Sequence, residues 1–137
     1  MAKDIYHDTV KTALLKDGWT ITDEFFRLAI GSRSVYIDLG AQKIIAAQKE
    51  DQKIAVEIKS FLSPSPVKDL ENALGQYILY RDGLNRSQPE RILYLAIQER
   101  VYLDFFQEEI AQMVVENHQI KLMIFDEEKQ EVIQWIE

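Results

Sequence analysis

Three ionisable residues, Asp38, Glu57 and Lys59, stand at spacings that could support metal-dependent chemistry. Asp38 ends the apolar run 35–37, and Glu57 and Lys59 alternate with apolar residues in the segment 54–60. Side chains two residues apart in a strand point to the same face, so Glu57 and Lys59 share one face of the predicted strand. A carboxylate beside an ammonium group can hold a divalent cation and orient a water molecule next to it. The same tripeptide also fits an ordinary strand with a solvated face.

The residue types narrow the choice of metal. The chain has no cysteine and only two histidines, His7 and His118, which excludes a thiolate site and argues against a histidine-built zinc centre. A metal here would be held by oxygen ligands, which favours Mg²⁺ or Mn²⁺. The net charge of −7 and the lack of a dense basic run predict weak intrinsic affinity for DNA, or help from a partner.

Length and composition predict one domain over residues 1–137. The chain has 137 residues, of which 47% are hydrophobic, so it is large enough and apolar enough to fold around a core. The amino-terminal residues carry no apolar signal region, and no apolar run approaches the length of a membrane span. We therefore expect a cytoplasmic protein without a membrane partner.

The order of predicted elements indicates an α/β fold. Helices are predicted over residues 3–17, 65–82 and 103–118, and strands over 19–22, 34–38, 43–48, 53–61, 92–97, 121–125 and 131–136. A polar hairpin connection is expected at 49–52 and a polar loop at 84–91, while the apolar segment 25–30 fits no single pattern. The near-continuous apolar run 92–97 is typical of a strand buried on both faces. The strand–helix–strand crossover from residue 54 to 97 is consistent with a parallel pair within a single mixed central sheet flanked by helices.

The order of Asp38, Glu57 and Lys59 along the chain resembles the catalytic core of the PD-(D/E)XK nuclease superfamily. Asp38 is followed by Glu57-x-Lys59 on a later strand and then by a helix that carries Gln76-x-x-x-Tyr80, the motif of RecB-like branches. The resemblance implies a restriction-endonuclease-like fold and a nuclease that hydrolyses DNA phosphodiesters. In the superfamily pattern a proline often precedes the aspartate, and this chain has Ile37 there.

The same resemblance assigns roles to individual residues. Asp38, Glu57 and the backbone carbonyl of Ile58 would ligate Mg²⁺ or Mn²⁺, and Lys59 would orient or activate the attacking water. Gln76 and Tyr80 would line the cleft and steady a phosphate. A carboxylate from the first helix often completes the metal site of such proteins, and the candidates here are Asp8 and also Asp4.

A closer resemblance covers nearly the whole chain. The segments 8–14, 17–22, 36–41, 55–61 and 73–77 are similar to those of the XisH family. That family comprises controlling factors for excision of the fdxN element, a DNA segment removed by site-specific recombination. The resemblance implies a role in programmed DNA excision beside a companion factor, XisI.

Two functions remain open at this point. One is a Mg²⁺-dependent nuclease that acts on DNA during excision. The other is a non-catalytic regulator that keeps the nuclease scaffold and binds its companion or the recombinase. The residues Asp38, Glu57 and Lys59, called the triad below, favour the first function. The acidic composition and the controlling role favour the second. A small domain with exposed strand edges could also pair into a homodimer.

Overall fold

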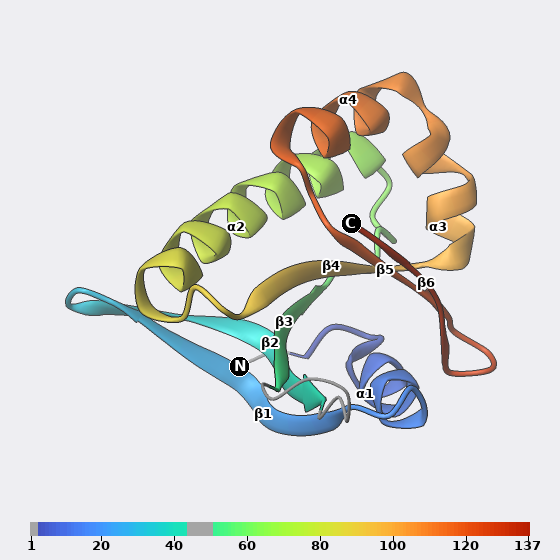
Figure 1. The fold of residues 1–137 in the computed structure, drawn as a ribbon. Coiled ribbons are helices and arrows are strands. Elements are labelled where there is room, and N and C mark those ends of the chain that lie inside the picture. The colour runs from blue at the N-terminus through green and yellow to red at the C-terminus, as the bar shows by residue number, and fades with distance from the viewer. Residues whose placement is uncertain (1–2, 44–50) are drawn as a thin grey trace.

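One six-stranded mixed sheet organises the fold, with helices on both of its faces (Figure 1). The computed structural model describes residues 3–43 and 51–137. The elements are, in chain order, α1 (His7–Lys16), β1 (Thr20–Ile30), β2 (Arg33–Lys43), β3 (Gln52–Ile58), α2 (Pro66–Ser87), β4 (Ile92–Gln98), α3 (Glu99–Leu103), η1 (Phe105–Gln107), α4 (Glu109–His118), β5 (Leu122–Asp126) and β6 (Glu131–Ile136).

The strands stand in the sheet in the same order as in the chain. The pairs β1–β2, β2–β3 and β5–β6 are antiparallel, whereas β3, β4 and β5 are parallel neighbours. The crossover between β3 and β4 is made by α2, so the predicted parallel pair and the predicted mixed α/β sheet are both confirmed. Among the described residues, no helix is long and apolar enough to cross a membrane.

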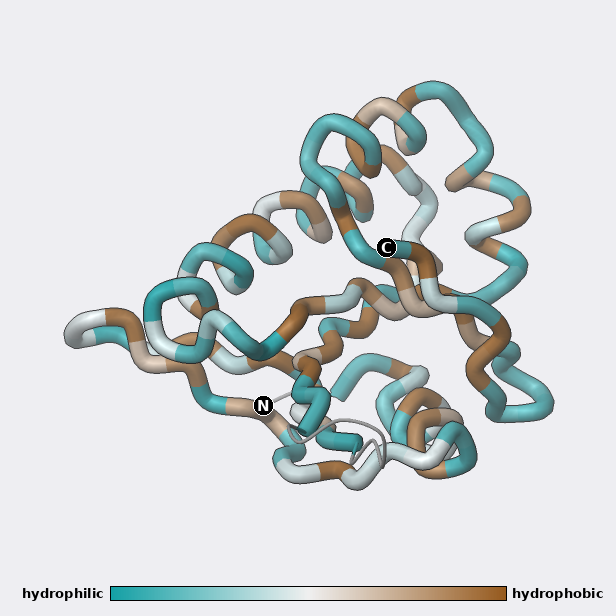
Figure 2. The backbone as a smooth tube through the Cα atoms, viewed as in Figure 1, coloured by the Kyte–Doolittle hydropathy of each residue, from teal (hydrophilic) through white to brown (hydrophobic). Residues whose placement is uncertain are grey.

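Two apolar layers enclose the sheet. The face toward α1 includes Ile54, Val56 and Ile58, while the face toward α2 includes Ala55 of the same strand. Both faces of β4 are buried, because Leu95 belongs to the α2 layer and its neighbours in the chain belong to the α1 layer. Hydrophobic and hydrophilic residues alternate along α2, and hydrophilic residues dominate the turn between β5 and β6 (Figure 2). The apolar layers therefore explain both predicted patterns, the alternating one of β3 and the continuous one of β4.

The predicted strand boundary near Gly40 is wrong. Strand β2 continues through Gly40 to Lys43, and β3 begins at Gln52. A Cβ atom on Gly40 would lie 2.9 Å from the Asp23 Oδ2 atom and 3.1 Å from the Phe26 ring, so this glycine permits close packing instead of a turn. Most of the strand predicted over 43–48 and part of the connection at 49–52 lie outside the described residues.

The amino-terminal segments also differ from the prediction. The short strand at 19–22 and the unassigned segment 25–30 form the single strand β1, which turns at Gly31 into β2. Helix α1 begins at His7 and not at residue 3, because the chain before it makes a turn in which the Tyr6 N–H donates to the Asp4 carboxylate at 2.9 Å.

Helix α2 begins as predicted but ends later. The Ser65 hydroxyl accepts the Lys68 N–H at 3.2 Å, which is an N-cap, and Pro66 follows at the first helical position. The expected stop at residues 82–83 is absent, and the predicted loop is helical as far as Ser87. A Cβ on Gly83 would lie 2.8 Å from the Leu28 Cδ2 atom, so this glycine lets α2 cross closely over β1 and does not end the helix.

The two glycines of α2 provide a test of this explanation. Gly75→Ala should stabilise the protein by about 0.5–1 kcal/mol, because alanine is the better helix former and its Cβ would meet no atom within 4 Å. Gly83→Ala should be about 1–3 kcal/mol less stable than Gly75→Ala, because its Cβ displaces side chains of β1. Urea unfolding of both variants measures the difference, and equal stabilities would contradict a packing role for Gly83.

The helix predicted over 103–118 is interrupted. It consists of α3, the short turn η1 and α4, so helical structure begins earlier, at Glu99, and breaks at Asp104. Phe105 and Phe106 are buried in the α2 layer, and both contact Phe61. The break allows both aromatic rings to reach the core, which a continuous helix would not do for adjacent residues.

Candidate functional site

The predicted triad comes together where the carboxyl end of β3 meets β2. The register pairs Leu39 with Val56, which places Asp38 opposite Glu57. The Asp38 N–H donates to the Glu57 Oε1 atom at 3.4 Å, and the Lys59 Nζ atom lies 3.6 Å from the Glu57 Oε2 atom. The Ile58 N–H donates to the Asp38 Oδ2 atom at 2.7 Å. Main-chain hydrogen bonds thus fix the two carboxylates relative to each other.

Strand β2 rotates sharply at Asp38. Ile37 packs in the α2 layer, whereas Leu39, two residues further on, packs in the α1 layer. Side chains at this spacing normally share a face, so the strand turns about its own axis between them. On the neighbouring strand β1, Phe25 has a left-handed backbone with φ of 57°, which is rare for a bulky residue. The rotation accompanies the approach of the Asp38 carboxylate to the end of β3.

Burial controls the protonation of Glu57. The residue is only 6% exposed, and this burial, with the nearby Asp38 carboxylate as the second cause, raises the pKa of Glu57 to about 8. Lys59 acts in the opposite direction but does not cancel the burial. Two carboxylates this close therefore hold a proton near neutral pH unless another cation replaces it.

Asp4 lies close enough to this cluster to interact with Asp38 and Lys59. Burial raises the pKa of Asp4, and the Asp38 carboxylate raises it further, while Lys59 and the Ser60 N–H lower it. Asp8, in contrast, is 79% exposed and pairs with the Lys3 ammonium at 3.5 Å. Of the two acidic residues considered for this segment, the structure brings Asp4 to the triad and places Asp8 in a different group. The reason is that Asp4 precedes α1, where the chain passes close to the end of β3.

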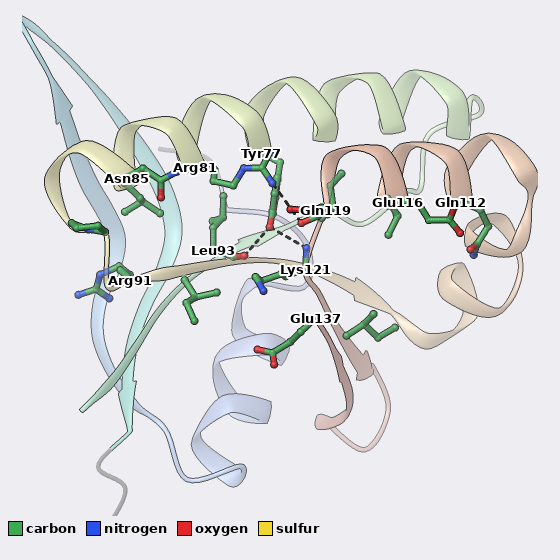
Figure 3. Close-up of a pocket in the computed structure, with 16 residues that line it drawn as sticks. Tyr77, Arg81, Asn85, Arg91, Leu93, Gln112, Glu116, Gln119, Lys121 and Glu137 are labelled. Atoms are coloured by element: carbon green, nitrogen blue, oxygen red, sulfur yellow. Dashed lines mark hydrogen bonds between the residues drawn. The ribbon is translucent and has the colours of Figure 1, made fainter. Parts of the chain in front are cut away.

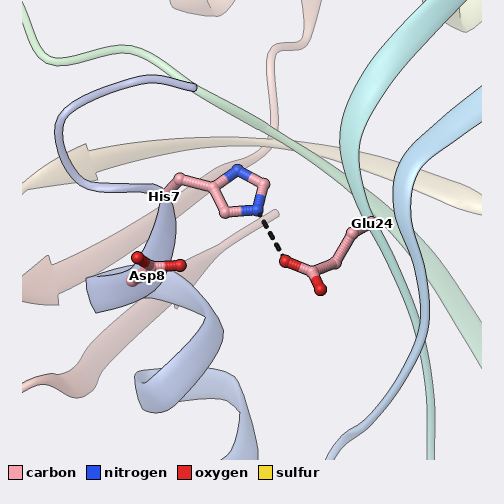
Figure 4. Close-up of side chains that lie close together, drawn as sticks. All are labelled: His7, Asp8 and Glu24. Atoms are coloured by element: carbon pink, nitrogen blue, oxygen red, sulfur yellow. Dashed lines mark hydrogen bonds and ion pairs between the residues drawn. The ribbon is translucent and has the colours of Figure 1, made fainter. Parts of the chain in front are cut away.

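Asp8 belongs to a group with His7 and Glu24 (Figure 4). The His7 Nε2 atom lies 3.1 Å from Glu24 Oε1, and the Lys11 ammonium lies 3.2 Å from Glu24 Oε2. Their hydrogen bonds to Glu24 lower the pKa of that carboxyl, His7 more than Lys11. Each carboxylate of the group already has a cationic partner, so we interpret it as an ion-pair network that ties α1 to β1.

Helix α2 carries both predicted cleft residues, Gln76 and Tyr80. Burial raises the pKa of Tyr80 to about 12, with further increases from the Glu57 and Asp38 carboxylates. Tyr80 therefore faces the triad. One helical turn earlier, the Gln76 Oε1 atom is buried without a hydrogen-bond partner among residues 3–43 and 51–137. An ordered water, an ion or a ligand would satisfy such an acceptor.

Gln98 is a residue of this region that the sequence pattern did not single out. It ends β4, is buried, and its amide donates to the Ser60 carbonyl at 3.3 Å. The neighbouring Lys59 N–H donates to the Ala96 carbonyl at 3.1 Å, so β4 holds the segment that follows Glu57 in place. The available signal was its position, because a polar residue at the carboxyl end of a buried parallel strand lies beside the corresponding end of the next strand.

The donor set suits a small divalent cation. Asp38 and Glu57 present carboxylate oxygens across the β2–β3 pair, whereas among residues 3–43 and 51–137 the carboxylate of Asp4 does not lie within 4.8 Å of both of them. Hard cations such as Mg²⁺ and Mn²⁺ prefer oxygen ligands of this kind. The proton held by Glu57 and the unpaired Gln76 acceptor both fit a site that binds a cation from solution.

The fold and site thus define a mixed α/β protein with a buried carboxylate–lysine cluster at the end of a central strand. Comparison with known proteins identifies the family. Residues 1–133 match the model of the XisH protein family, so the chain belongs to that family. Among curated proteins, none matches the chain.

Two solved structures are similar over almost the whole chain. One is an XisH family protein from Nostoc punctiforme PCC 73102, with 40% sequence identity and a TM-score of 0.89 over 98% of this chain and 100% of that one. The other is an fdxN element excision controlling factor protein from Anabaena variabilis, with 38% identity and a TM-score of 0.88 over the same shares. The resemblance to the XisH family predicted from sequence is therefore confirmed.

Proposed function

We propose that this chain controls excision of a DNA element and that Asp38, Glu57 and Lys59 form a Mg²⁺-dependent centre for phosphodiester hydrolysis. The observation that carries the second part is the meeting of two carboxylates across β2 and β3, with an ammonium group 3.6 Å from one of them. Membership of the XisH family and the similarity to an excision controlling factor support the first part.

The residues of the chain would divide the work as follows. A Mg²⁺ or Mn²⁺ ion, held by Asp38, Glu57 and the Ile58 carbonyl, would polarise the scissile phosphate and stabilise charge on it. Lys59 lies beside Glu57, where it can hold the attacking water by a hydrogen bond. Gln76 has a free buried acceptor and Tyr80 a hydroxyl that keeps its proton, so both can position a ligand from α2.

The topology is compatible with a restriction-endonuclease-like fold of the PD-(D/E)XK type. An antiparallel β2–β3 pair carries the triad, and the crossover helix α2 that follows covers it before the chain enters the parallel strand β4. This order of strand, strand, helix and strand is what the sequence resemblance implies for the superfamily, and it supports the proposed chemistry.

A cleavage assay tests the catalytic part of the proposal. Labelled linear, nicked and branched DNA should be cut in the presence of Mn²⁺ or Mg²⁺, and Asp38→Asn should abolish cutting because it removes a charged ligand. Asp69→Asn, which changes a carboxylate near the start of α2, is the matched control and should cut normally. Absence of cutting on every substrate by the folded protein would reject the nuclease function.

The acidic net charge of the chain favours a second function, that of a non-catalytic regulator. The net charge is −7, Arg91 is buried, and Arg100 pairs with Glu127 at 2.8 Å, so these arginines do not form a basic DNA-binding rim. Such a regulator would act by binding an XisI-like companion or the recombinase. It predicts a complex with the companion that Asp38→Asn leaves intact, measured by co-purification over a range of salt concentrations. Failure to form this complex would reject the companion as the regulator's target.

A further inference from the structure

A cavity of about 650 Å³ lies on the side of the sheet covered by α2, away from the carboxylate cluster (Figure 3). Its walls come from the second half of α2, from α4, from the amino ends of β4 and β5, and from the carboxyl end of β6 with Ile136 and Glu137. Glu57 and Lys59 are at the carboxyl end of β3, whereas the cavity includes Ile92 and Leu93 at the opposite end of the parallel strand β4. The volume is within the range of small-molecule binding sites.

The cavity is lined by three cations, Arg81, Arg91 and Lys121, and by two carboxylates, Glu116 and Glu137. Within residues 3–43 and 51–137, none of these three cations forms an ion pair within 4.0 Å. An anion bound in the cavity could therefore form direct ion pairs with these cations.

Two of these cations are held in fixed positions. The Arg81 Nη1 atom donates to the His118 carbonyl at 2.6 Å, and its guanidinium lies 5.2 Å from the centre of the Tyr77 ring. Arg91 is 9% exposed and donates to the Ile54 carbonyl at 2.8 Å and to the Gln88 side chain at 2.9 Å. A guanidinium has five N–H donors, so each arginine keeps others for a ligand. Such preorganisation lowers the entropic cost of binding.

The end of the cavity away from Arg81 and Arg91 carries hydrogen-bond acceptors. Arg81, Asn85 and Arg91 lie on one side of Lys121, and Gln112 and Glu116 lie on the other (Figure 3). The amide and carboxylate oxygens at that second end can accept hydrogen bonds. Apolar side chains also line the cavity, namely Leu93, Val115, Ile120 and Ile136.

We propose that this cavity binds an organic phosphate of the size of a mononucleotide. The phosphate would contact Lys121 and Arg81, the planar base would lie on the apolar wall, and its N–H donors would face Gln112 and Glu116. This inference does not depend on the proposed nuclease function, because the cavity and the carboxylate cluster share no residue.

Calorimetric titration with AMP, GMP, CMP and UMP tests the proposal, with EDTA present so that no divalent cation takes part. At least one nucleotide should bind the wild type, and Lys121→Glu should weaken binding at least tenfold. The Lys121 side chain makes no hydrogen bond among the described residues, so the variant should fold, and Lys121→Gln gives a milder change at the same position. Lys129→Glu makes the same charge change on the exposed β5–β6 turn, and it should bind as the wild type does.

Several results would overturn the proposal. They are the absence of binding by all four nucleotides at millimolar concentration, unchanged binding by both Lys121 variants, and binding of inorganic phosphate or of adenosine as tight as that of AMP. Equal binding of inorganic phosphate would show that the base is not needed, and equal binding of adenosine would show that the phosphate is not needed. Changes in methyl NMR chemical shifts on nucleotide addition locate the bound ligand. They should be largest at Leu93, Val115 and Ile120 and absent at Ile58.

Discussion

Glu57→Gln should stabilise the metal-free protein at pH 8 by about 2–4 kcal/mol and change its stability little near pH 5. In the folded protein the pKa of Glu57 is raised to about 8 from an ordinary value of 4.5, chiefly by burial. The folded state therefore binds a proton that the unfolded chain releases near pH 4.5. The contribution of Glu57 to the stability of the folded state is therefore complete below pH 4.5, and it is lost as the pH rises through 8. Glutamine keeps an uncharged side chain at every pH, so the variant avoids the loss.

Urea unfolding at pH 5, 6.5 and 8 in the presence of EDTA measures this effect as the difference between variant and wild type. Glu71→Gln is the control, because Glu71 is exposed on α2 and its replacement should change stability by less than about 0.5 kcal/mol at any of these pH values. A difference between Glu57→Gln and wild type that is independent of pH would show that Glu57 titrates normally.

Lys59→Met should reduce DNA cleavage by about 10²–10⁴-fold while leaving the protein folded. The methionine side chain has a similar length but cannot hold a water molecule at the position beside Glu57. Initial rates on a substrate that the wild type cuts, together with a melting curve, measure both expectations. Lys68→Met removes an exposed lysine that pairs with Glu71 on α2 and should leave the rate unchanged.

The same variant has a second readout that does not require cleavage. Lys59 lowers the pKa of Glu57, so its removal should move the pH dependence of stability to higher pH. Cleavage at the normal rate, with or without this shift, would remove Lys59 from the mechanism. Loss of cleavage without the shift would mean that the ammonium group does not act next to Glu57.

Alternation and order in the sequence were sufficient to predict the centre of the fold. The apolar residues of β3 and the continuous apolar run of β4 identified a mixed sheet, and they placed Glu57 and Lys59 on a strand with α2 after it. The capping residues Ser65 and Pro66 identified the start of α2 because an N-cap is a local interaction. The family resemblance was equally visible, because its segments are spread over the chain.

Features that depend on contacts between distant segments could not be predicted in this way. Gly40 and Gly83 look like turn signals in the sequence, but each is required where another element passes within 3 Å of its missing Cβ. The choice of Asp4 over Asp8 depends on where the chain runs before α1. The cavity combines residues from α2, α4 and the ends of three strands, and no spacing in the sequence relates them.

The order of the strands has a consequence for the way the chain folds. Every neighbour in the sheet is also a neighbour in the chain, so each strand can pair as soon as the next segment is available, without threading past an earlier one. The hairpins β1–β2 and β5–β6 pair residues close in the chain and should form first, whereas the parallel pairing of β3 with β4 joins Ile54 with Ile92 and should form more slowly. The longest loop closure is the packing of α1 on β6, where the Lys16 ammonium donates to the Lys129 carbonyl at 2.7 Å across 113 positions. Joining of the two ends of the chain is therefore the step that we expect to come last.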